Sequence, residues 1–125
     1  MQVGDFAYVE DLILRRRVSG EGRLFLVDRE YRSFVKLDGI ETKITVPAGM
    51  ATDLASIPAC VPNWIARKVD AHIEAAIVHD FLCVARPWTY KVAADIFNAA
   101  MRAAKVPSAT RELMYRAVLY LGPKW

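Results

Sequence analysis

The sequence predicts an α+β protein in which a small N-terminal antiparallel sheet is followed by three to four packed helices. Short apolar stretches separated by glycines fill most of residues 1–50, a pattern typical of strands and tight turns. Apolar residues at helical spacing dominate residues 60–122. A length of 125 residues, with 54% hydrophobic and 25% charged residues, suits a single globular domain, 1–125.

The strands are expected in the first part of the chain. The strongest local signal is Asp38-Gly39, because an Asp-Gly pair favours the two-residue turn of a hairpin. This turn joins residues 33–37 to residues 41–46, where apolar and polar side chains alternate. The remaining strands are expected at residues 6–9, 12–14, 23–27 and 31–37.

The helices are expected in the second part. Residues 71–85 are apolar on nearly every side, as a buried helix is. Pro87 ends that helix, and Thr89 is placed to cap the next one at residues 90–104. A short helix is expected near residues 62–68, and a last helix runs from Ser108 to Gly122. The core residues expected on the last helix are Leu113, Met114, Ala117, Val118 and Leu121.

Charge and cysteine content narrow the class of protein. Much of the formal net charge of +3 comes from Arg15, Arg16 and Arg17, with no aromatic residues between them, so nucleic-acid binding is not expected. No stretch resembles a signal peptide or a transmembrane segment. Two cysteines, Cys60 and Cys83, provide no disulfide framework, and we expect both to be unpaired in a protein made in a reducing cytoplasm.

His79 and Asp80, in the middle of the apolar helix, are the main candidates for a functional site. Burying two ionisable groups costs several kcal/mol unless they are hydrogen-bonded, paired or placed in a wet cleft. Asp53 and Ser56 precede the helix in a loop rich in turn residues. They either cap a turn or the next helix, or they face the same cleft as His79.

Other arrangements of the same residue types have weaker support. His72 and His79 are two helical turns apart, about 10 Å, and do not form the i, i+4 pair of a zinc site. Ser56, His79 and Asp95 have the residue types of a nucleophilic triad, but no nucleophile elbow surrounds Ser56. Asp95 also belongs to a polar helix stripe that is typical of a solvated face with a Lys91–Asp95 pair. The stripe consists of Lys91, Asp95, Asn98 and Arg102.

Five short motifs follow one another along residues 40–122. They are Ile44-Thr-Val-Pro-Ala-Gly, Thr52-Asp-Leu-Ala-Ser-Ile-Pro58, Ala76-Ile-Val-His-Asp-Phe-Leu, Ala94-Asp95-Ile-Phe97 and Arg111-x-x-Met114-Tyr115-x-Ala-Val. In this order they resemble the uncharacterised phage and prophage family known as domain of unknown function 1353. The resemblance implies a bacteriophage or prophage origin and carries no established activity.

A second resemblance is local. His79-Asp80, followed by Asp95 on the next helix, is similar to the catalytic helices of phospholipases A2. It implies that His79 activates water, that Asp80 binds calcium, the one cofactor suggested, and that Asp95 orients His79. The chain has Cys83 where that pattern has Tyr, and residues 52–58 would have to supply the remaining calcium ligands.

Two functions follow as expectations. One is a water-activating, lipase-like hydrolase acting on a lipid or another small molecule, built on His79, Asp80, Asp95, Asp53 and Ser56. The other is a noncatalytic structural or host-interaction module, with a structural His-Asp dyad, that binds a phage or host protein. An open cleft at His79 favours the first function, and a sealed dyad favours the second. In both cases we expect synthesis in the host bacterial cytoplasm, and the virion is the further location expected for a phage protein.

Overall fold

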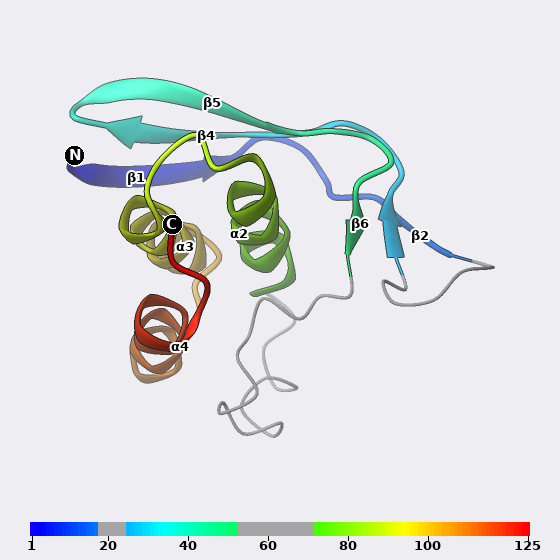
Figure 1. Ribbon diagram of the computed structural model, residues 1–125. Coiled ribbons are helices and arrows are strands. Elements are labelled where there is room, and N and C mark those ends of the chain that lie inside the picture. Colours follow the sequence, from blue (N-terminus) through cyan, green and yellow to red (C-terminus); the bar gives the residue numbers. More distant parts are fainter. Residues whose placement is uncertain (18–24, 53–71) are drawn as a thin grey trace.

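The computed structural model describes residues 1–17, 25–52 and 72–125, in which strands are followed by helices (Figure 1). The strands are β1 (Val3–Tyr8), β2 (Leu14–Arg16), β3 (Phe25–Val27), β4 (Tyr31–Leu37), β5 (Ile40–Val46) and β6 (Ala51–Thr52). The helices are α2 (His72–Ala85), α3 (Tyr90–Ala103) and α4 (Ser108–Leu121). The predicted α+β arrangement is confirmed. The short helix expected near residues 62–68 lies outside the described residues.

The described strands form two antiparallel sheets of three strands each, in the orders β1-β4-β5 and β2-β3-β6. The predicted hairpin joins β4 to β5, with Leu37 opposite Ile40. Asp38 and Gly39 both have positive φ, 51° and 78°, as the tight turn of such a hairpin requires. The second strand begins at Leu14 rather than at residue 12, because Leu14 pairs with Val27.

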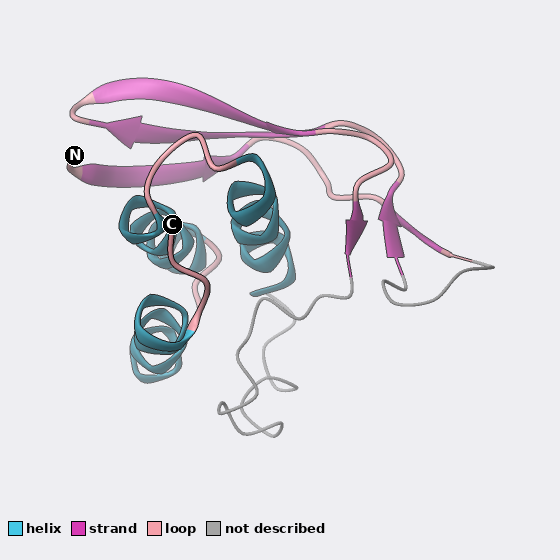
Figure 2. Cartoon of the chain, viewed as in Figure 1, coloured by secondary structure: helices cyan, strands magenta, loops and turns pink. Residues whose placement is uncertain are grey.

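The helices gather on one side of the β1-β4-β5 sheet (Figure 2). Helix α3 packs against β1 and also contacts α2 and α4, and α2 contacts β5. The Tyr8 hydroxyl at the end of β1 donates to the Ala100 carbonyl of α3 at 2.9 Å, which fixes that helix to the sheet. Buried and more exposed residues alternate along β4, as expected for a strand with one face on the core. In the part of the chain described, no helix is long and apolar enough to cross a membrane.

Local signals set the ends of the helices. The Thr89 side chain accepts a hydrogen bond from the Val92 backbone N–H at 3.3 Å, so the predicted cap of α3 is confirmed. Helix α4 ends at Gly122, whose missing side chain leaves room for the Val118 carbonyl. A Cβ atom at Gly122 would lie 2.5 Å from that oxygen. Because Gly122 has an ordinary negative φ, its backbone conformation does not require glycine. The close approach of the Val118 carbonyl does.

Two parts of the predicted core are wrong. On α4, Met114, Ala117 and Val118 are buried, whereas Leu113 is 41% exposed and Leu121 is 65% exposed. The buried residues are three and four positions apart and share the face that meets α3. Leu113 is rotated away from this face by about 100° from Met114, whereas Leu121 shares the face but is the last residue of the helix. The prediction that α2 is buried on nearly every side fails at its last turn, because Val84 is 68% exposed.

Candidate functional site

His79 lies in the middle of α2, with its imidazole enclosed between its own helix and α3. Its side chain is only 5% exposed. The Cys83 sulfur, one turn further along α2, lies 3.8 Å from both ring nitrogens, and the Phe97 ring of α3 lies 5.0 Å away between ring centroids. Burial lowers the pKa of His79 to about 4, so the imidazole is neutral at pH 7.

The neighbours of His79 form a closed, weakly polar environment. A thiol is a weak hydrogen-bond partner. The Phe97 ring packs against the imidazole but provides no carboxylate that could orient it. Residues four apart share a helix face, which places Cys83 beside His79, and the packing of α2 on α3 supplies Phe97. Neither Cys83 nor Phe97 brings a charged group to the imidazole at pH 7. The arrangement holds an uncharged ring within the core.

Asp95 lies on α3 but does not meet His79. It precedes Phe97 by two residues, a rotation of about 200° around a helix, so the two side chains leave opposite faces. Phe97 faces His79, whereas the Asp95 carboxylate accepts a hydrogen bond from the Tyr115 hydroxyl of α4 at 2.6 Å. The structure therefore joins Asp95 to Tyr115 instead of to His79. No Lys91–Asp95 ion pair occurs among the residues described.

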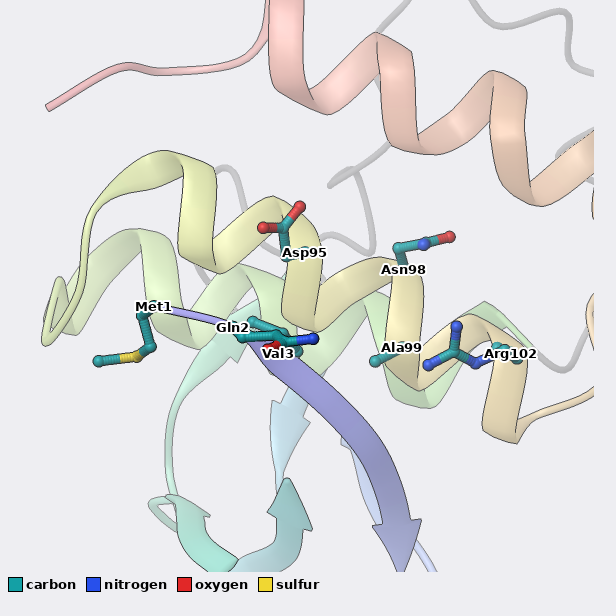
Figure 3. Close-up of a pocket in the computed structure, with 7 residues that line it drawn as sticks. All are labelled: Met1, Gln2, Val3, Asp95, Asn98, Ala99 and Arg102. Carbon is teal, nitrogen blue, oxygen red and sulfur yellow. The ribbon is translucent and has the colours of Figure 1, made fainter. Parts of the chain in front are cut away.

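Asp95 borders a polar pocket of about 540 Å³, shown in Figure 3. The pocket lies between α3 and the start of β1. Its lining residues are Met1, Gln2, Val3, Asp95, Asn98, Ala99 and Arg102. Part of the stripe predicted to be a solvated helix face is thus set against the N-terminal strand, and both Asp95 and Asn98 are half-buried.

Of the remaining predicted site residues, the structure describes only Asp80. Asp80 is half-buried, and successive helical residues point about 100° apart. Burial and then the negative charge of Asp80 raise the pKa of the free Cys83 thiol to about 11. Asp53 and Ser56 lie outside the described residues, as does Cys60.

The calcium prediction for Asp80 stays a prediction. Within residues 1–17, 25–52 and 72–125, no group of three or more His, Cys, Asp or Glu side chains is placed to hold a metal ion. Asp80 alone would supply one hard oxygen ligand, whereas calcium takes six to eight.

Sequence reasoning missed a second pocket, which is walled in part by acidic and tyrosine side chains near the end of β1. Its lining residues are Tyr8, Glu10, Asp11, Leu12, Tyr31, Glu74 and Ala104. The adjacent pair Glu10-Asp11 was a signal available in the sequence. Glu74 is more than sixty residues further along the chain, and only the packing of α2 brings it to the same place.

The fold and the site together define an α+β protein with helices on one side of a sheet and a closed histidine in its central helix. Residues 27–118 match the model of the family described as "Protein of unknown function (DUF1353)". The chain belongs to this family, as its motif order predicted.

Two uncharacterised proteins of Sinorhizobium fredii are similar to this chain. Protein y4jT is 34% identical over 84 residues, which cover 66% of this chain and 25% of y4jT. Protein y4iH is 32% identical over 75 residues, which cover 59% of this chain and 31% of y4iH. The chain thus spans less than a third of the length of each relative. No solved structure matches it significantly.

Proposed function

We propose that this protein is a noncatalytic interaction module of bacteriophage or prophage origin, in which His79 has a structural role. The closure of His79 carries the proposal, because its imidazole is 5% exposed and packs against Cys83 and Phe97. A catalytic base must reach the proton that it removes, and it is commonly oriented by a carboxylate. Asp95, the carboxylate expected in that role, bonds to Tyr115 on the other face of α3.

The extent of the similarity to longer proteins also supports a module. The matching regions cover only 25% and 31% of the two rhizobial relatives. A segment that recurs as a minor part of longer chains fits a unit that is joined to other functions. The proposed phage or prophage origin rests on the resemblance of the five motifs in residues 40–122 to the phage and prophage family named above.

A lipase-like hydrolase built on His79 and Asp80 is the second candidate function. One observation favours it: the imidazole is neutral at pH 7, which is the form that accepts a proton. However, a base with a pKa near 4 is poorly matched to proton transfer at neutral pH. The module therefore remains the better supported function.

Hydrolysis assays separate the two functions. Wild type, His79→Gln and Asp80→Asn are incubated with p-nitrophenyl butyrate and with phosphatidylcholine vesicles, each with and without millimolar calcium. Glu112→Gln, an exposed change on α4, is the matched control. We expect every protein to give the rate of the buffer blank. Hydrolysis by wild type and the control that is lost in His79→Gln would overturn the module and establish the hydrolase.

A further inference from the structure

The acidic pocket found near the end of β1 has the walls of a small binding site. Its volume is about 340 Å³. Four separate parts of the chain form it: the end of β1 with the segment that follows it, the first residue of β4, the first turn of α2 and the residue that follows α3. The pocket therefore exists only when the sheet and the helices are packed together.

The described residues of the pocket carry net negative charge. Of its three carboxylates, Glu10 is matched by the Arg32 guanidinium, with Nε and Nη2 at 3.1 and 3.0 Å from its two oxygens. Asp11 and Glu74 form no ion pair with any other described residue. Ala104 lies at the C-terminal end of α3, where the helix dipole adds partial negative charge.

Tyr31 provides an independent sign of a ligand. Tyr31 lines this pocket and is 1% exposed, yet its buried hydroxyl has no hydrogen-bond partner among the described residues. Buried hydroxyls are nearly always hydrogen-bonded, so a missing partner indicates a group supplied from outside. Glu10, Asp11 and Glu74 line the same pocket as Tyr31, and burial, followed by the charges of Glu74, Glu10 and Asp11, raises the pKa of the phenol.

We propose that this pocket binds a lysine or arginine side chain of a partner protein. The cationic group donates hydrogen bonds to Asp11, Glu74 and the Tyr31 oxygen. The ring of Tyr8, held in place by its hydrogen bond to Ala100, adds an aromatic wall that favours a cation. An anionic or neutral group would leave both carboxylates unmatched. This inference rests on the proposed module function, because it names the chemistry by which the module recognises its partner.

The occupant follows from charge complementarity. A side chain delivers its cation at the end of an apolar stem, and Leu12 in the pocket wall provides a surface for that stem. A metal ion is the less suitable occupant, since Glu10 is already bound by Arg32 and no group of metal-binding side chains occurs in the described parts of the chain.

A peptide titration followed by two-dimensional ¹H–¹⁵N NMR tests the inference. The probes are the capped tripeptides acetyl-Gly-Arg-Gly-amide and acetyl-Gly-Lys-Gly-amide, and acetyl-Gly-Gln-Gly-amide is the uncharged control. We expect the two cationic peptides to shift the amide signals of Asp11, Tyr31 and Glu74 saturably, and the control peptide to leave them unchanged. Added salt should weaken the effect, because screening acts on partly exposed charges. Absence of saturable shifts, or equal shifts with the control, would overturn the inference.

Variants separate binding from folding. Glu74→Gln should weaken binding by about tenfold or more, because it removes a charge-assisted hydrogen bond. Glu112→Gln makes the same charge change outside the pocket and should leave the affinity unchanged. Tyr31→Phe should weaken binding without lowering the melting temperature, since its hydroxyl has no partner among the described residues of the free protein. Equal affinity for wild type and Glu74→Gln contradicts the inference. The peptide titration does not depend on hydrolysis, so its failure is distinct from failure of the proposed function.

Discussion

The closure of His79 predicts that the fold loses stability in mild acid. Burial lowers the pKa of the imidazole to about 4 in the folded chain, against 6.5 as its ordinary value. Between these two values the unfolded chain binds a proton that the folded chain excludes. The free energy of unfolding must therefore fall as the pH falls from the higher value to the lower one. The destabilisation caused by His79 reaches its full size only below both pKa values.

The size of this effect follows from the two pKa values. Relative to pH 7, the loss attributable to His79 is roughly 1 kcal/mol at about pH 5.5 and roughly 2.5 kcal/mol at about pH 4.5. Small domains have total stabilities of about 5–15 kcal/mol, so such a loss is readily measured.

Urea denaturation of wild type and His79→Gln at several pH values isolates the effect. Carboxylates that titrate in acid, such as Glu10, whose hydrogen bonds to Arg32 lower its pKa, contribute equally to both proteins. As the pH falls from 7, the free energy of unfolding of wild type should therefore decrease relative to that of His79→Gln by the amounts given above. A difference that is constant from pH 7 to about 4.5, or an NMR titration of the ring with a midpoint near 6.5, would refute the argument.

Three further predictions follow from packing and burial. Met114→Ala should lower the free energy of unfolding by about 2–5 kcal/mol, and Leu113→Ala by much less, because only Met114 is buried; urea denaturation checks this. Tyr115→Phe should cost about 1 kcal/mol through loss of its hydrogen bond between α4 and α3, and an unchanged melting curve would contradict it. The third prediction concerns the Cys83 thiol in a Cys60→Ser background. At about pH 8 it should react with iodoacetamide about a hundredfold more slowly in the folded protein than in urea, because its pKa is raised. Equal rates would contradict the raised pKa.

Local patterns were sufficient to predict most elements and their ends. The Asp38-Gly39 hairpin depends on two adjacent residues that accept positive φ, and the start of α3 depends on Thr89 bonding three residues ahead. Interactions of such short range are encoded in neighbouring residues, and they predict structure without knowledge of the rest of the fold. The family followed similarly from the order of motifs in the sequence.

Prediction was weaker wherever one element had to be oriented against another. Composition marks Leu113 and Leu121 as apolar, but the rotation of α4 against α3 leaves Leu113 exposed, and Leu121 is exposed at the last residue of the helix. The polar stripe containing Asp95 suggested a solvated face, whereas α4 brings Tyr115 to that carboxylate. A helix with several apolar residues can present more than one face to its neighbours, so its amphipathic pattern alone does not select the buried one.

The sequence by itself determined that His79 stands within an apolar helix, and hence that its charged form is disfavoured, because desolvation depends mainly on the surrounding apolar residues. Only the tertiary structure decided what the ring meets: the rotation of α3 turns Phe97 toward His79 and Asp95 toward Tyr115. The acidic pocket has the same origin, since Glu74 joins Glu10 and Asp11 only through packing of α2 near the end of β1. Contacts between residues far apart in the sequence arise from the packing of whole elements, which no local pattern specifies.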